Sequence, residues 1–303
     1  MAAAALVLAG CATRSPSERS DDVFSILYEG KSTAQFATSL PVGSPAEAEA
    51  RGDAAARDGE LDEAIFEYVR GLRIAEKGSP GMLYKIGMIH ERQSNTELAA
   101  IAYRWALRAD PGHRPSTTRL GLMLLRHRQY EAAEHRLRPI VESGAPFWLA
   151  HNGMGVLCDL RGDHHQAANH YRDALRFNPD SALVMNNLGY SLYMAGDWAG
   201  AEKMLRAALE REENYDLAWR NLALVWARSG EYQEAIAALQ RTSSTEAAYN
   251  DLGYVEMMDG NYPVATRLFH QAMDISPRYY EMAVENERRA QRLMTRERDL
   301  ARQ

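Results

Sequence analysis

Histidine is the residue type here with the greatest capacity for metal or acid–base chemistry, but the spacing of the histidines does not favour such a site. His90 and Glu91 begin the pattern of a zinc-protease helix, yet Ser94 stands where the second metal-binding histidine is required. His164 and His165 could bind a metal, although His164 falls at a helix-packing position of the repeat described below. The sequence also lacks a phosphate-binding glycine loop and a nucleophile elbow. We therefore expect no enzyme activity, no metal site and no cofactor apart from covalent lipid.

The two cysteines lie in different contexts and do not predict a disulfide framework. Cys158 aligns with leucine or tryptophan in other copies of the repeat, which indicates a buried, small hydrophobic side chain. Cys11 follows a short apolar run that ends in two small residues, and small residues fit the cleft of a signal peptidase.

The sequence Leu8-Ala9-Gly10-Cys11 resembles the lipobox of bacterial lipoproteins. This resemblance implies a diacylglycerol on the Cys11 thiol and acylation of the new amino terminus, and several acyl chains anchor a protein well. No Lys or Arg precedes the apolar run, so we expect the numbered start to lie inside a longer signal peptide; a chance alanine-rich terminus is the alternative. Ala12, rather than an aspartate, follows Cys11, which favours the periplasmic face of the outer membrane.

Residues 12–44 are expected to form a tether and an amino-terminal segment, after a signal-peptide remnant and lipobox at 1–11. The part directly after Cys11 is polar and serine-rich, a composition that cannot bury a core. Val23–Tyr28 is apolar instead. It could pack on the first repeat or engage a partner, and packing is the favoured interpretation.

Composition limits the classes of partner. The chain has 303 residues, a net charge of −6 and 25% charged residues, which is ordinary for a globular protein. No basic stripe stands out, so a nucleic-acid partner is not expected. No apolar run reaches the roughly 18 residues that a membrane-spanning helix requires.

Small residues recur about every 34 residues over most of the chain. They stand at Gly52, Gly87, Gly121, Gly155, Gly189, Ala223 and Gly253. An alanine follows each by twelve residues, at Ala64, Ala99, Ala133, Ala167, Ala201, Ala235 and Ala265. A large apolar residue follows each by sixteen, at Tyr68, Tyr103, Leu137, Tyr171, Leu205, Leu239 and Phe269. A glycine follows by seven residues in five units, whereas Ser94 and Arg128 occupy that place in the other two.

Each of these columns has a physical reason in a helical hairpin. The first small residue lets the first helix approach its partner closely, and the large residue of the second helix fills the space between them. The alanine lets the second helix lie against the first. The glycine seven residues on ends the first helix, where a left-handed residue is wanted.

The pattern resembles the tetratricopeptide repeat over residues 45–279. The resemblance implies an all-α fold, a right-handed superhelical solenoid of about seven helical hairpins. We expect the repeats at 45–79, 80–113, 114–147, 148–181, 182–215, 216–245 and 246–279. Residues 280–303 are charged, with apolar residues at roughly helical spacing, which predicts a capping helix. The sixth repeat is four residues short, which removes about one turn of helix.

In this repeat class the first helix of each hairpin lines a groove, so positions around each small residue predict a binding surface. The predicted peptide-binding groove comprises Asn186, Asn187, Tyr190, Tyr193, Arg220, Asn221, Asn250, Asp251 and Tyr254. Asparagine can donate and accept hydrogen bonds at once, and tyrosine gives a large contact area at low entropic cost. The alternative is that these asparagines bond only to neighbouring helices; groove binding is the favoured interpretation.

The lipobox, the tether and the repeats together resemble the TadD family of the Flp (tight adherence) pilus assembly system. The resemblance is plainest in residues 186–190, 220–224 and 249–254. It implies a pilotin-like adaptor that binds the outer-membrane secretin, or another protein of the system, through a short peptide segment and aids its targeting or assembly. The alternative is a general envelope adaptor lipoprotein that recruits proteases or peptidoglycan enzymes.

Overall fold

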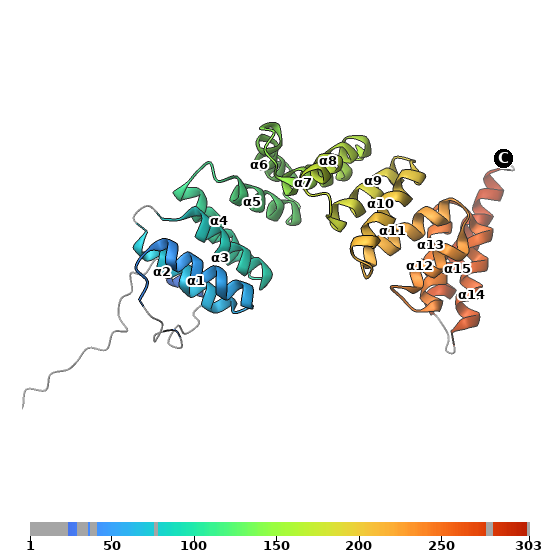
Figure 1. The fold of residues 1–303 in the computed structure, drawn as a ribbon. Helices are drawn as coiled ribbons and strands as arrows, with labels where there is room; N and C mark the ends of the chain where they lie inside the picture. Colours follow the sequence, from blue (N-terminus) through green and yellow to red (C-terminus); the bar gives the residue numbers. More distant parts are fainter. Residues whose placement is uncertain (1–23, 29–35, 37–40, 76–77, 277–280, 302–303) are drawn as a thin grey trace, which may run out of the picture. The chain divides into compact units, whose positions relative to one another are not determined.

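The computed structural model describes residues 24–28, 36, 41–75, 78–276 and 281–301. The described residues form fifteen α-helices and one short 3-10 helix, which confirms the all-α class (Figure 1). The chain divides into two compact units, residues 1–116 and 117–303. Cys11 and its flanking lipobox lie outside the described residues.

Unit 1 contains a short amino-terminal helix and two hairpins. Its elements are η1 (Ser25–Tyr28), α1 (Pro45–Asp58), α2 (Leu61–Ile74), α3 (Pro80–Arg92) and α4 (Thr96–Ala109). Helix α5 (Arg114–Arg126) begins in unit 1 and continues into unit 2. Within unit 1, α1 packs on α2 and α3 packs on α4.

Unit 2 continues the array and ends in the longest helix of the described chain. Its elements are α6 (Tyr130–Glu142), α7 (Trp148–Leu160), α8 (His164–Phe177), α9 (Ala182–Met194), α10 (Trp198–Arg211), α11 (Asp216–Arg228), α12 (Tyr232–Gln240), α13 (Thr245–Met258), α14 (Tyr262–Ile275) and α15 (Glu281–Leu300). Neighbouring helices pair as α7 with α8, α9 with α10, α11 with α12 and α13 with α14, and α15 covers α14. The expected carboxy-terminal helix is therefore present. No helix in the described ranges is both long and apolar enough to cross a bilayer.

Side chains that cap the first turn fix where several helices begin. The hydroxyls of Ser44, Ser79 and Ser181 accept hydrogen bonds from backbone N–H groups three residues ahead. Asp163 and Asp197 do the same at the starts of α8 and α10.

A left-handed residue ends the first helix of each hairpin, as the sequence predicts. Gly59, Gly162, Gly196, Gly230 and Gly260 have φ between 78° and 86°. Ser94 and Arg128 take the same conformation, with φ of 65° and 59°. The turn geometry is thus kept in the two repeats that lack the glycine, at a cost in backbone strain.

In the six hairpins whose small residue is glycine, that glycine lies against the large residue sixteen positions later. A Cβ added at Gly87 or Gly155 would lie 2.4 or 2.5 Å from a ring carbon of Tyr103 or Tyr171. At Gly189 the nearest atom would be a Leu205 side-chain carbon at 2.6 Å. The alanines twelve positions on are all fully buried. These contacts confirm the roles that the sequence assigns to the columns.

The tyrosines of the large-residue column also bond back to the first helix. Tyr103 donates to Glu91 at 2.7 Å and Tyr171 donates to Asp159 at 2.8 Å. Burial, reinforced by Asp159, raises the pKa of Tyr171 well above its usual range. The Tyr171 hydroxyl therefore stays protonated and acts as a fixed donor.

The shortening of the sixth repeat falls in its second helix. Helix α12 has 9 residues, whereas α10 and α14 each have 14. The loss is somewhat more than one helical turn of about 3.6 residues.

The apolar amino-terminal segment packs on the first hairpins, as favoured from the sequence. Leu27 is fully buried in the cluster formed with α2, α3 and α4. Phe24 and Tyr28 lie against the same cluster.

Replacing Gly155 by alanine should lower the free energy of unfolding by about 1–3 kcal/mol, because the new Cβ meets the buried Tyr171 ring. The direction of the change in unfolding free energy is informative, because alanine in place of glycine would otherwise stabilise a helix by about 1 kcal/mol. Urea denaturation measures the change. Gly81→Ala in α3 is the matched control, because its Cβ would meet only side-chain oxygens at 3.8 Å. Equal or greater stability of Gly155→Ala would contradict this packing.

Replacing Arg128 by glycine should raise the free energy of unfolding by about 0.5–1 kcal/mol. The substitution relieves a left-handed conformation that costs about 1–2 kcal/mol, partly offset by the greater freedom of glycine in the unfolded chain. Gly162→Ala is the reverse experiment and should destabilise by about 1 kcal/mol through backbone strain alone, since its Cβ would meet nothing within 4 Å. The same denaturation series tests both, and a destabilised Arg128→Gly protein would refute the interpretation.

Candidate functional site

A cavity of about 570 Å³ opens on unit 2 where α7, α9 and α11 lie side by side. It contains four of the nine predicted groove residues, namely Asn186, Asn187, Tyr190 and Asn221. Its other lining residues are Val156, Asp159, Leu160, Gly162, His164, Tyr171, Met194 and Leu217. Its size is typical of a ligand or peptide side-chain pocket.

An asparagine ladder crosses the floor of this cavity. Asn187 donates to the Asn152 side-chain oxygen at 3.0 Å, and Asn186 donates to Asn187 at 3.3 Å. Asn221 then donates to Asn186 at 2.9 Å. The ladder joins α7, α9 and α11 through amides that each retain further hydrogen-bonding capacity.

The members of the ladder differ in exposure. Asn186 is 1% exposed and Asn221 is 8% exposed, whereas Asn187 is half-buried. Asn186 accepts from Asn221 of α11 and donates to Asn187 of its own helix, so bonding to a neighbouring helix, the alternative weighed from the sequence, describes part of its role. Asn187 is the most exposed of the three ladder residues that line the cavity.

Large apolar side chains surround the amides. Leu160, Tyr190, Met194 and Leu217 are each between 38% and 55% exposed although they line a cavity. Exposed apolar side chains gathered around a few fixed polar groups are typical of a binding site. The surface is suited to an extended peptide, whose backbone needs hydrogen bonds and whose side chains need apolar contacts.

Asp159 lies at one end of the cavity, where hydrogen-bond donors surround its carboxylate. Its carboxylate accepts from the Tyr171 hydroxyl at 2.8 Å, from Ser191 at 2.9 Å and from His164 Nδ1 at 2.9 Å. Three donors satisfy most of its acceptor capacity, so Asp159 holds His164 in place rather than offering a free charge. His164 thus acts as a hydrogen-bonding partner at the start of α8.

The remaining predicted residues do not line this cavity. Tyr193 packs on the apolar core of unit 2, and Arg220 donates to Thr242 at 3.3 Å. Asn250 is buried and accepts from Asn286 of α15 at 3.0 Å. Asp251 and Tyr254 are exposed on α13.

Leu160, Met194 and Leu217 line the cavity but are not among the residues that the sequence predicts. A helical spacing could have found Met194, because Leu183, Asn187, Tyr190 and Met194 follow one another at i, i+4, i+7 and i+11 along α9. Leu160 stands at the corresponding place on α7. The recurrent residues that identify the repeat are those that pack the helices together. Leu160, Met194 and Leu217 are not among these packing residues.

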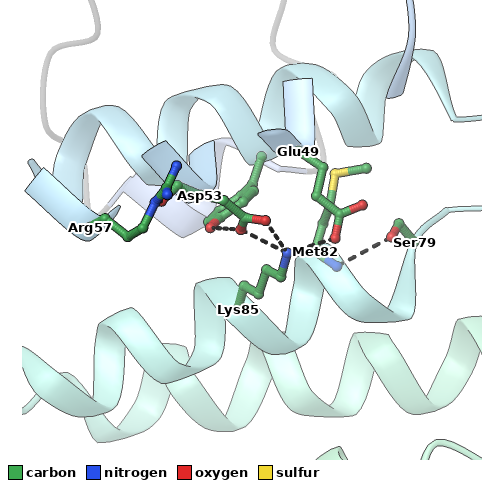
Figure 2. Close-up of polar contacts among 7 residues, drawn as sticks. Glu49, Asp53, Arg57, Ser79, Met82 and Lys85 are labelled. Carbon is green, nitrogen blue, oxygen red and sulfur yellow. Dashed lines mark hydrogen bonds and ion pairs between the residues drawn. The ribbon is translucent and has the colours of Figure 1, made fainter. Parts of the chain in front are cut away.

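In unit 1, charged residues stand around the position that corresponds to Asn187. Lys85 stands two residues before Gly87, as Asn187 stands two residues before Gly189. Its ammonium group bonds Glu49 at 2.8 Å and Asp53 at 2.7 Å, as Figure 2 shows. Burial alone would raise the pKa of Asp53, but hydrogen bonds from Lys85 and Tyr68 outweigh it and lower that pKa. The charges of this cluster are satisfied within unit 1, so the amide-lined cavity of unit 2 is the better binding surface.

In the described part of the chain, no group of three or more His, Cys, Asp or Glu side chains is arranged to hold a metal ion. Cys158, which is buried, has a thiol pKa raised by burial. The site in unit 2 offers hydrogen bonds and apolar contact.

Comparison with known proteins identifies the repeat. The tetratricopeptide repeat family matches residues 118–182, 161–202, 186–250 and 245–278, which together span just over half of the chain. Human tetratricopeptide repeat protein 7A is 30% identical over 112 residues, which are 36% of this chain and 13% of that protein. The TPR repeat-containing protein PA4299 of Pseudomonas aeruginosa is 32% identical over 92 residues, which are 30% of this chain and 38% of that protein. The chain thus matches less than half the length of these two relatives.

Solved structures show the same fold at low sequence identity. A tetratricopeptide repeat protein from Parabacteroides merdae superposes with a TM-score of 0.53 at 16% identity, over 82% of this chain and 100% of that chain. PilF of Pseudomonas aeruginosa superposes with a TM-score of 0.52 at 17% identity, over 70% of this chain and 96% of that chain. Tetratricopeptide repeats are scaffolds that bind segments of partner proteins and are typically non-catalytic. The chain belongs to the tetratricopeptide repeat family.

Proposed function

We propose that this protein is an outer-membrane lipoprotein whose unit 2 cavity captures a short segment of a secretin of a Flp (tight adherence) pilus system. The observation that carries the binding role is the cavity on α7, α9 and α11, where an amide ladder lies among exposed apolar side chains. The captured secretin would then be brought to, or assembled in, the membrane that holds the lipid anchor.

The chemistry of the cavity defines the guest. The amides of Asn187 and Asn221 match the donors and acceptors of an extended backbone. Tyr190, Met194 and Leu217 provide apolar surface for one or two guest side chains. Ordering a disordered segment costs a few kcal/mol, so affinity would depend on these apolar anchors.

The choice of a secretin as partner is supported by the sequence resemblance to the TadD family. Two of its plainest stretches, residues 186–190 and 220–224, lie on α9 and α11, two of the three helices that the ladder joins. Lipidation at Cys11 and placement at the periplasmic face of the outer membrane are supported by the lipobox resemblance at Leu8–Cys11.

The double variant Tyr190→Ala/Leu217→Ala should weaken binding of peptides from the cognate secretin tail by at least tenfold, because each truncation removes an apolar anchor worth about 1–2 kcal/mol. Fluorescence anisotropy with overlapping tail peptides measures the affinity. The control is Ile74→Ala/Ile275→Ala, which truncates two equally exposed side chains outside the cavity. Unchanged affinity in the groove variant, or no binding of any tail peptide to wild type, would count against the proposal.

Replacing Cys11 by serine should move the protein from the outer-membrane fraction to the soluble periplasmic fraction, because the lipid attachment atom is lost. Density-gradient fractionation with immunoblotting measures the distribution. Cys158→Ser is the matched control, since that buried thiol should leave the distribution unchanged. Membrane retention of Cys11→Ser, or a wild-type protein that is soluble or in the inner membrane, would disprove the localisation.

A further inference from the structure

The protein fills a cleft between the second helices of its first two hairpins with its own amino-terminal segment. Leu27 of η1 is buried in the cluster that contains Leu72 of α2 and Ile86 of α3. Phe24 lies edge-on to Trp105 of α4, with ring centroids 5.8 Å apart. The backbone oxygen of Leu27 lies 3.1 Å from Nε2 of the buried His90. These contacts hold the segment against unit 1.

The repeat register places an equivalent cleft between α8 and α10, over α9. Positions can be matched between the units by counting from the small residue of each hairpin. By this count Leu175 of unit 2 corresponds to Leu72 of unit 1, Leu188 to Ile86, and Met204 to Ala102. These three residues of unit 2, with Leu192, form the apolar floor of a cavity of about 420 Å³. None of the described segments fills this cavity. The apolar floor that η1 covers in unit 1 is therefore open in unit 2, where Leu192 and Ala207 stand in place of His90 and Trp105.

The edge of the open cleft differs from its filled counterpart in charge. Val69 and Ile101 of unit 1 correspond to Arg172 and Lys203 of unit 2. Arg176 also lines the cavity and corresponds to Arg73 of unit 1, while Asp197 adds a carboxylate. Arg172 and Arg176 bond exposed neighbours, Asn169 at 3.0 Å and Asp173 at 3.3 Å. Surface contacts of this kind leave the charges available to a guest.

The peptide segment that would fit the cleft between α8 and α10 is apolar in its middle and acidic at its ends. The segment that fills the equivalent cleft has this composition in the sequence, because Asp21 and Asp22 precede its apolar residues and Glu29 follows them. Its apolar side chains show what the floor accepts, and its carboxylates complement Arg172 and Lys203, which stand where unit 1 has Val69 and Ile101.

We propose that the cleft between α8 and α10 is a second docking surface, which takes a short aromatic–aliphatic segment of a partner protein that is flanked by carboxylates. This surface involves the second helices of the hairpins, whereas the cavity of the proposed function lies on the first helices, so either assignment can fail without the other.

A labelled peptide with the sequence of residues 21–29 tests the proposal against the full-length protein. Wild type should bind it, and Arg172→Glu/Lys203→Glu should bind at least tenfold more weakly, with the wild-type affinity falling as salt is raised. The matched control is Arg292→Glu/Arg296→Glu, which makes the same change in net charge on the exposed face of α15. A peptide with serine in place of Phe24 and Leu27 should not bind.

Three results would overturn the proposal. They are the absence of peptide binding, binding that survives the Arg172→Glu/Lys203→Glu reversal, and binding that the α15 control weakens equally. Self-association of the protein without peptide, abolished by the same double reversal, would identify a second copy of the chain as the occupant and would also overturn the assignment to a partner.

Discussion

The contact between each small residue and the large residue sixteen positions later is the constraint on which the rest of the structure depends. At Gly155 there is no room for a side chain, because a Cβ would lie 2.5 Å from the Tyr171 ring. That approach brings the Tyr171 hydroxyl to Asp159, which in turn holds His164 and Ser191. The packing of one hairpin thus builds one end of the binding cavity.

The two units use this shared packing to present different surfaces. In unit 1, Lys85 forms ion pairs with Glu49 and Asp53, whereas unit 2 has hydrogen-bonded asparagines around the corresponding position. Recognition at the proposed site in unit 2 would therefore depend on shape, apolar contact and backbone hydrogen bonds, and little on salt. At the second docking surface that we propose, between α8 and α10, Arg172 and Lys203 would make charge part of the selection.

The sequence predicted the fold well because its columns record packing, and packing is repeated seven times. The glycines that end the first helices, the buried alanines and the shortened sixth repeat all appear in the structure as expected. The left-handed conformation of Ser94 and Arg128 was not anticipated, since neither residue favours it; the turn between two packed helices imposes it.

The site was less predictable, because binding residues are those that packing leaves free. Asn187 and Tyr190 were recognised from their offsets and do line the cavity, but Met194 and Leu217 carry no signal beyond helical spacing. Asn250 has the same type and offset as Asn186, yet it bonds Asn286 of the capping helix, a contact that no repeat pattern specifies. The neighbours of each hairpin, rather than its own sequence, decide which asparagines reach a guest.

Site-specific photocrosslinking tests the central claim most directly. A photoreactive phenylalanine analogue placed at position 190, in the native membrane, should crosslink to one short segment of the secretin, while the same group at position 275 should not. The account predicts a single crosslinked segment whose apolar residues face Tyr190, Met194 and Leu217. Equal crosslinking from both positions, or no secretin crosslink from position 190, would contradict it.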